Sequence, residues 1–502
     1  MPVISKENLM RLSPSQTLQR LDLDAFARRL LSVRRAYKRG GPAPERQLLY
    51  YGVMDSVNPP ALLAVVGHPS SGRSSWLQAE LSEQTWRSLA DTWPALLWPE
   101  MEVHDRTGRV PEGHPDLHPL LKPHMHTLSG RASGAGVFSL PLGPVRADVT
   151  ESGYFLFDTI GEQIMHLQPQ LFYKHRGIER MAVGRTVEDV TLLAERISGT
   201  TTAGHTAAYV TAVEQASGYA TPDAVRWERQ LFMELERLYN HAHDISQMAS
   251  ASGMTVGQAQ VARVKEECLR LAGDLTGCRY LRGAIKPFGS AAIDWRAVSS
   301  IVLDRLAAAD ARMQRFVSLL QRTPTFVDRL VGTGIVNRDW ADDYGLVGPT
   351  ARACGIRTDA RLEYAPWTSD VGFTLCVVPR ANGDALDRFE VRVQEWSVSI
   401  QMIRSLLSRL ASTNHAENSD GPHGSPGPTV SKGWGGGTVE GPRGRISHVV
   451  QVDHGRIAFW GIRSASSWIW PVFGLATANG NIQTDFPVID ASFGLSYAGL
   501  DR

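Results

Sequence analysis

The chain has 502 residues, of which 43% are apolar and 21% are charged, enough for two or three domains with a sizeable core. Its formal net charge of +1 gives no electrostatic reason to expect nucleic acid as a partner. The four cysteines form no Cys-x-x-Cys pair, which argues against a disulfide framework or an iron–sulfur site held by this chain: Cys268, Cys278, Cys354 and Cys376.

The N-terminal segment lacks the apolar stretch of a signal peptide, and no run of about 18 apolar residues occurs elsewhere. We therefore expect a cytoplasmic protein that contacts a membrane only through partners. Residues 16–38 carry apolar side chains at helical spacing and predict an amphipathic helix. Strand-like runs at 47–53 and 61–66 follow, separated by the turn signal at 58–60.

The second strand-like run leads into a glycine-rich segment, residues 67–75, that has the outline of a phosphate-binding P-loop. A P-loop lysine reaches the terminal phosphates as a compact charge. Arg73 stands at that position, and its planar guanidinium is not an equivalent group. The residues therefore disfavour a nucleotide site, and a Ser/Gly turn is the simpler interpretation.

Residues 98–121 combine a Glu-x-Glu-x-x-Asp-x-x-Gly motif with a following Gly-His-Pro-Asp-Leu stretch. Small residues over 129–142 then predict a linker, and the run Gly-Pro-Val-Arg ending at Arg146 opens a second domain. A zinc site is a minor alternative in this region, because no structural zinc spacing stands out among its five histidines: His104, His114, His118, His124 and His126.

The second domain shows mainly helical patterns. Thr186 and Asp189 form a capping-box-like start to a helix that stops at the Ser-Gly pair 198–199, and a second helix follows over 205–216. We interpret His241 and His243 as structural, hydrogen-bonded histidines more readily than as metal ligands. Further helices are predicted over 224–250, 261–275 and 301–320 and up to about 410, strand-like runs over 447–453 and 456–461, and a mobile insertion over 412–438.

These patterns predict an α+β chain, with a small α/β domain followed by a mainly α-helical domain that contains small β hairpins. The second domain carries a signature made of His-Arg-Gly-Ile-Glu at 175–179, Glu-Arg-Ile at 195–197, and a C-terminal Asp-Arg at 501–502. This signature resembles the large subunit of group 4, formate hydrogenlyase-type [NiFe] hydrogenases and the 49-kDa-type subunit of respiratory complex I. Residues 98–121 resemble the 30-kDa-type subunit of complex I.

The resemblance implies a domain division into a 30-kDa-like docking domain (1–128), a linker (129–142) and a hydrogenase-like or 49-kDa-like domain (143–502). In the hydrogenases, four cysteines of this second domain bind nickel and iron. The matching positions here are Ser198, Thr201, Ser496 and Gly499. A hydroxyl stays protonated near neutral pH and binds such metals far more weakly than a thiolate. We therefore expect no nickel and no iron–sulfur cluster in this chain.

The resemblance also implies roles for individual residues. Arg176 would lie beside a partner's [4Fe-4S] cluster, and Glu179 and Arg463 would be catalytic groups that relay protons. The family tyrosine that binds a quinone head group falls at Gly199, and a family histidine falls at Arg146, so both head-group partners are replaced. The residues expected to line the cavity or bind a quinone are Arg146, Ser198, Gly199, Thr201, His205, Ser496 and Tyr497.

Two functions follow from this resemblance. The first is a peripheral-arm subunit of a membrane-bound, ion-translocating oxidoreductase that passes electrons from a partner's [4Fe-4S] cluster to a quinone-like acceptor. The alternative is a catalytically silent coupling scaffold in a related complex, whereas hydrogen turnover is disfavoured by the missing thiolates. Both imply the cytoplasmic side of a bacterial plasma membrane and the same partners: an iron–sulfur small subunit, a ferredoxin-like iron–sulfur subunit and integral membrane subunits that include antiporter-like ones.

Overall fold

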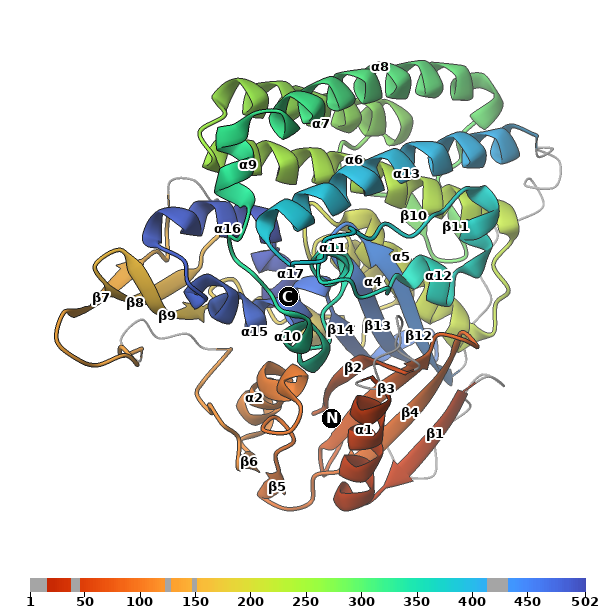
Figure 1. Ribbon diagram of the computed structural model, residues 1–502. Helices are drawn as coiled ribbons and strands as arrows, with labels where there is room; N and C mark the ends of the chain where they lie inside the picture. Colours follow the sequence, from red (N-terminus) through yellow and green to blue (C-terminus); the bar gives the residue numbers. More distant parts are fainter. Residues whose placement is uncertain (1–15, 38–45, 122–127, 147–150, 413–431) are drawn as a thin grey trace.

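The computed structural model describes residues 16–37, 46–121, 128–146, 151–412 and 432–502. Long helices stack at one end of the molecule, the N-terminal sheet lies at the other end, and a second sheet lies between them (Figure 1). This arrangement confirms the predicted α+β chain with a small N-terminal α/β domain and a mainly helical second domain. No helix within the described residues has both the length and the apolarity that a membrane span requires.

The N-terminal domain is built on a four-stranded sheet with the order β1-β4-β3-β2. Strand β1 runs parallel to β4, and the other pairs are antiparallel. The helix predicted over 16–38 is wrong at its start: residues 16–21 form β1, and Asp22 caps the following helix by accepting a hydrogen bond from the Ala25 amide (2.6 Å). The elements are β1 (Gln16–Leu21), α1 (Leu23–Tyr37), β2 (Gln47–Met54), β3 (Ala61–His68) and β4 (Arg73–Glu80).

The glycine-rich segment 67–75 forms the tight connection of a β hairpin. His68 at the end of β3 pairs with Arg73 at the start of β4, and Gly72 has a φ of 63° in the turn. A P-loop requires a helix after the glycine-rich segment, because the helix N-terminus binds the phosphates. Here a strand follows, so the turn interpretation is confirmed and the nucleotide interpretation is wrong.

Beside the sheet lies a short helical layer, in which α2 carries the carboxylates of the Glu-x-Glu motif. The Glu100 side chain is fully buried and accepts hydrogen bonds from the Ser88 hydroxyl and the Leu89 amide (2.9 Å). Burial raises the pKa of Glu100 to about 7 even though these bonds favour the charged form. The elements are β5 (Thr85–Arg87), η2 (Pro94–Leu96), α2 (Leu97–Thr107) and β6 (Val110–Glu112).

The raised pKa of Glu100 predicts a loss of stability with rising pH. The folded chain binds this proton more tightly than the unfolded chain, so the free energy of unfolding falls as the pH rises from about 4.5 through 7, by about 3 kcal/mol. Urea unfolding across this range should show the loss in the wild type and a smaller loss in Glu100→Gln. The exposed Glu162→Gln is the control, and equal pH profiles for all three proteins would refute the prediction.

The second domain opens with a three-stranded antiparallel sheet, β7-β8-β9. Strand β7 (Val137–Leu142) pairs with β8 (Tyr154–Ile160), which pairs with β9 (Gln163–Gln170). The last six residues of the stretch expected to be a linker therefore form β7. Helix α15 (Ala465–Ala478) packs on this sheet, where the Leu167 carbonyl comes so close to Gly474 that a Cβ there would lie 2.6 Å from the oxygen.

Four long helices form the layer at the far end of the molecule: α6 (Asp223–Ala251), α7 (Thr255–Thr276), α8 (Trp295–Gln321) and α13 (Ala385–Ser412). All four correspond to predicted helices, and Thr186 caps α4 by accepting a bond from the Asp189 amide (3.2 Å), as its motif predicts. The shorter elements are α3 (Ile178–Ala182), α4 (Val187–Ala194), α5 (Thr202–Ser217), β10 (Ile285–Lys286), β11 (Gly289–Ser290), α9 (Pro324–Leu330), α10 (Arg338–Asp343), α11 (Gly348–Ala353), α12 (Ala360–Tyr364), η3 (Pro366–Val371), η4 (Gln483–Asp485), α16 (Phe486–Phe493) and α17 (Tyr497–Asp501).

The central sheet consists of β12 (Lys432–Gly441), β13 (Gly444–Asp453) and β14 (Arg456–Arg463). The mobile insertion predicted over 412–438 is wrong from residue 432 onward, because this stretch is strand β12; residues 413–431 lie outside the described part. Glycines 433, 435 and 437 face helix α5, where an added Cβ would lie about 2 Å from the carbonyl oxygens of Ala216, Ala212 and Ala208. The glycines thus allow close packing of helix on strand and are not a sign of flexibility.

Candidate functional site

The structure brings together the four positions that match the nickel ligands. Ser198 and Thr201 lie in the turn before α5, and Ser496 and Gly499 lie at the start of α17. The hydroxyl oxygens of Ser198 and Ser496 are 3.1 Å apart, and Ser496 also accepts a hydrogen bond from the Gly499 amide (2.9 Å). The three hydroxyl side chains are buried, so segments that are 298 residues apart in the chain meet in the interior.

A small space lies beside these positions, lined by Thr201, Ser496 and Gly499 but not by Ser198. Its volume is about 10 Å³, which is at the lower limit for one water molecule. Three hydroxyl groups and a glycine supply no thiolate, and thiolates are the ligands that hold a nickel–iron centre. These donors do not fit such a centre, and the hydroxyls of Ser198 and Ser496 contact each other instead. The lining residues are Thr201, His205, Arg443, Gly444, Ile446, Ser464, Ala465, Ser466, Ser496 and Gly499.

The double role of Ser496 gives a stability prediction. Its replacement by alanine removes both the N-terminal cap of α17 and the contact with Ser198, so we expect Ser496→Ala to lower the free energy of unfolding by about 1–2 kcal/mol. Urea unfolding measures this change. Ser82→Ala, at an exposed position, should stay within about 0.5 kcal/mol of the wild type. A Ser496→Ala protein as stable as the wild type would show that the two hydroxyls do not meet.

A row of buried rings leads to this closed space. Trp460 donates its indole N–H to His448 Nδ1 (3.2 Å), and His448 Nε2 lies 3.0 Å from His205 Nδ1. The indole can only donate, so His448 must carry its proton on Nε2 and donate to His205, which then carries its own proton on Nε2. Burial, with Arg502 nearby, lowers the pKa of His205 to about 3, and burial also holds the pKa of His448 well below its usual range. Both rings are therefore neutral at physiological pH.

Glu179 and Arg463, the residues expected to be catalytic, belong to a buried ion-pair network. Glu179 bonds Arg106 (2.7 Å), and Arg463 bonds Glu102 (2.8 Å). Arg502 joins both carboxylates, at 2.9 Å from Glu102 and 3.2 Å from Glu179. We call these five side chains the junction network, because Glu102 and Arg106 belong to the N-terminal domain and the other three to the second domain.

The charged groups of the junction network also form hydrogen bonds to the backbone. The Glu179 carboxylate also accepts a bond from the Ile462 amide (2.8 Å), and Arg463 donates to the Tyr51 carbonyl (3.0 Å). The neighbouring arginines, Arg463 foremost, hold the pKa of Glu102 below its usual range despite the opposing effect of burial. With these partners in place, the network joins the two domains through charges that neither domain could bury alone.

Arg146 and Tyr497, expected at a quinone site, contact each other instead. Arg146 forms an ion pair with Asp490 (2.8 Å) and a hydrogen bond with the Tyr497 hydroxyl (3.1 Å). Its guanidinium also lies over the rings of Phe155 and Phe486, at 5.2 and 5.6 Å from their centroids. These contacts hold Arg146 against the β7-β8-β9 sheet. They also engage the Arg146 guanidinium and the Tyr497 hydroxyl with each other.

Arg176 and Gly199 lie at the surface of the chain beside the closed space. Arg176 donates to the carbonyls of Arg196 (2.7 Å) and Ile197 (2.8 Å), directly before Ser198, and its side chain remains partly accessible. Gly199 is exposed, and an added Cβ would meet no atom within 4 Å. The position that matches the quinone-binding tyrosine is thus an open surface of this chain and no part of its interior.

The histidines of the alternative metal interpretations have structural partners. His241 contacts the Glu395 carboxylate (2.8 Å) within the helical layer, and the prediction of a hydrogen-bonded histidine is confirmed there. His104 and His114 each bond a backbone carbonyl, at 2.7 and 3.0 Å. His124 and His126 lie outside the described residues. Within the described part, no group of three or more His, Cys, Asp or Glu side chains is arranged to hold a metal ion.

Sequence reasoning missed the partners that surround the expected site residues. Glu102 and Arg106 lie within the Glu-x-Glu-x-x-Asp-x-x-Gly stretch, and Arg502 belongs to the C-terminal Asp-Arg pair. Their contact across the two domains depends on the fold. His448 and Trp460 carried no sequence signal, since alternation along a strand does not show which residue faces a histidine on a helix.

The fold and this site define a subunit related to nickel-dependent hydrogenase and to subunits of respiratory-chain NADH dehydrogenase. Residues 252–502 match the family described as the 49 Kd subunit of respiratory-chain NADH dehydrogenase, residues 51–132 the 30 Kd subunit, and residues 176–250 nickel-dependent hydrogenase. The chain belongs to the family of the 49 Kd subunit of respiratory-chain NADH dehydrogenase.

Curated relatives agree with this assignment. The chain is 28% identical to formate hydrogenlyase subunit 5 of Escherichia coli over 472 residues, 86% of this chain and 80% of the relative. It is 28% identical to an NADH-quinone oxidoreductase subunit of Deinococcus radiodurans (55% and 68% covered) and 25% identical to the membrane-bound hydrogenase subunit alpha of Pyrococcus furiosus (63% and 76%). The resemblance to both families is confirmed, and the chain is a subunit of this oxidoreductase class.

Proposed function

We propose that this chain is a nickel-free, peripheral-arm subunit of a membrane-bound, ion-translocating oxidoreductase complex, and that it serves there as a coupling scaffold. The observation that carries this proposal is the direct contact of Ser198 with Ser496 at the position that matches the metal centre, beside a space of about 10 Å³ that Ser496 helps to line. A substrate or metal cluster has no room there. The remaining parts, a layer of long packed helices and a buried network that joins two domains, suit a subunit that transmits movement between its neighbours.

The proposal includes the cellular setting of such a subunit. Its relatives are named as subunits of membrane-bound hydrogenase and of NADH-quinone oxidoreductase, and no described helix can span a membrane. We therefore infer that it lies on the cytoplasmic side of the plasma membrane. The partners proposed are an iron–sulfur small subunit, a ferredoxin-like iron–sulfur subunit and integral membrane subunits.

A second candidate function is electron transfer to a quinone at the surface beside Arg176. The observation in its favour is the open space at Gly199, next to an arginine whose position is fixed by two carbonyl groups. A partner subunit that covers this surface would complete a cavity, with its cluster close to the guanidinium. The positive charge of Arg176 would then stabilise the reduced cluster and raise its reduction potential.

Electron paramagnetic resonance on the complex purified from membranes distinguishes the two candidates. The reduced iron–sulfur signal is recorded before and after addition of a short-chain ubiquinone or menaquinone. If the chain is a scaffold, the reduced iron–sulfur signal should stay unchanged after the quinone is added, for much longer than one turnover of a quinone reductase takes. Rapid reoxidation, with a lower cluster potential in Arg176→Met than in the control Arg263→Met, would instead establish the quinone function.

A further inference from the structure

A large cleft lies in the N-terminal domain, away from the position that matches the metal centre. It has a volume of about 680 Å³ and lies between the start of α1, the ends of β1 and β4, and the strands β5 and β6. Its floor is apolar and aromatic, formed by Phe26, Tyr51, Leu62, Trp86 and Leu89. Ligand clefts of proteins commonly measure about 300–1,000 Å³, so this one can seat several side chains of a ligand or a partner.

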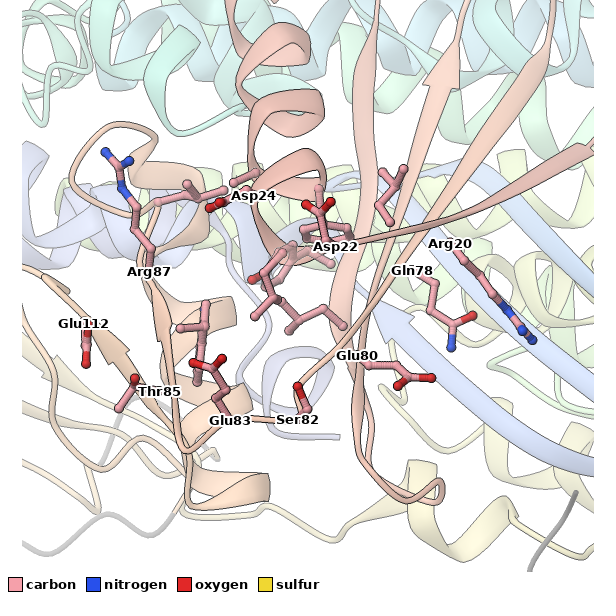
Figure 2. A pocket seen from close by; sticks show the side chains of 18 residues that line it. Arg20, Asp22, Asp24, Gln78, Glu80, Ser82, Glu83, Thr85, Arg87 and Glu112 are labelled. Carbon is pink, nitrogen blue, oxygen red and sulfur yellow. The ribbon is translucent and has the colours of Figure 1, made fainter. Parts of the chain in front are cut away.

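The rim of the cleft is strongly acidic. Figure 2 shows Asp22, Asp24, Glu80 and Glu83 between Arg87 on one side and Arg20 on the other. Together with Glu112, the rim has five carboxylates against two guanidinium groups, whereas the whole chain has a net charge of only +1. The negative charge is therefore concentrated at this cleft, where it attracts cationic groups.

Three of these carboxylates have no partner within the described residues. Asp24, Glu83 and Glu112 are exposed, and their side chains make no ion pair or hydrogen bond there. On most protein surfaces, charges of both signs are interspersed, because like charges repel. Unpaired carboxylates around an apolar floor thus resemble one half of an interface whose other half is basic and carries an apolar side chain.

We propose that this cleft, named the acidic cleft here, is the docking site for a basic segment of a partner subunit. Lysine or arginine side chains of the segment would pair with Asp24, Glu83 and Glu112, and an apolar side chain would cover Phe26 and Trp86. The inference rests on the proposed function, since the occupant is another subunit of the same complex. It assigns the N-terminal domain a binding surface of its own, separate from the Arg176 surface.

Carboxylate labelling with a water-soluble carbodiimide and glycinamide tests this inference. The chain is labelled alone and within the complex purified from membranes, and each site is quantified by mass spectrometry. We expect Asp24, Glu83 and Glu112 to react at least fivefold more slowly in the complex. Asp304 is the matched control, an exposed carboxylate on α8 at the opposite end of the molecule, and it should react equally in both.

Omission of glycinamide identifies the occupant. The carbodiimide should then link at least one of the three carboxylates directly to a lysine of another subunit, and Asp24→Lys with Glu83→Lys should lose that subunit on washing, unlike Asp304→Lys. Equal labelling in the isolated chain and the complex would overturn the inference and leave the proposed function intact. A cross-link to Lys6 of the same chain would also overturn it, while failure to recover any complex would contradict the proposed function itself.

Discussion

Replacement of Arg463 by methionine is expected to lower the free energy of unfolding by about 3–5 kcal/mol. The side chain is 3% exposed, and its removal leaves Glu102 buried with less compensating charge. The Tyr51 carbonyl also loses its donor. Urea unfolding at pH 7 measures the loss, and because the network joins the two domains, we expect both domains to unfold in one transition at lower urea.

A matched surface variant and a double variant separate this effect from a general one. Arg263→Met breaks an exposed ion pair with Glu267 and should change stability by less than about 1 kcal/mol. Combining Arg463→Met with Glu102→Gln should restore part of the loss, since the excess negative charge that Arg463 had balanced is then absent. A stable Arg463→Met protein whose complex has lost electron transfer would show that Arg463 is catalytic and that the junction network is not its main role.

Replacement of Gly435 by alanine is expected to destabilise the chain by about 3 kcal/mol, at the upper end of the range for overpacked cores. The new Cβ would lie 1.9 Å from the Ala212 carbonyl oxygen and 2.7 Å from the Ala216 nitrogen. Both atoms belong to the backbone of α5, so no side chain can rotate away and the helix itself must move. Thermal unfolding followed by circular dichroism measures the effect.

The position of α5 links this packing to the closed site, because Thr201 is the residue that precedes the helix and His205 lies in its first turn. Gly289→Ala is the control, since an added Cβ there meets no atom within 4 Å. The prediction fails if both alanine variants melt at the same temperature as the wild type, which would mean that α5 does not lie against β12 at the separation seen here.

The helical patterns and the family signature predicted most of the architecture correctly. Apolar spacing identified the long helices α6, α7, α8 and α13, since their periodicity extends over many turns. The prediction was wrong at the start of α1, because residues 16–21 pair with β4, a partner 58 positions away that no local pattern reveals. The prediction of a mobile segment at the glycines of β12 was wrong for a related reason. Composition alone suggested mobility, whereas their small size allows close packing against α5.

At the site, the sequence indicated that Ser198, Thr201, Ser496 and Gly499 belong together and could not indicate how they meet. The replacement of four cysteines suggested a missing metal, but the hydrogen bond between Ser198 and Ser496 depends on the distance between two loops. Glu179 belongs to the His-Arg-Gly-Ile-Glu motif, and the family resemblance implied a catalytic role for it and for Arg463. Their partners Glu102 and Arg106 come from the other domain, and only the folded arrangement shows that the charges neutralise one another across the junction.

The nickel content of the native complex tests the central claim most directly. The complex is purified from membranes, and nickel and iron are quantified by mass spectrometry per mole of this chain. The account predicts iron from the partner subunits and less than about 0.1 nickel per chain, because the hydroxyls at the matching positions are not the thiolate ligands that a nickel–iron centre requires. One nickel per chain, lost on substitution of Ser198 or Ser496, would contradict it.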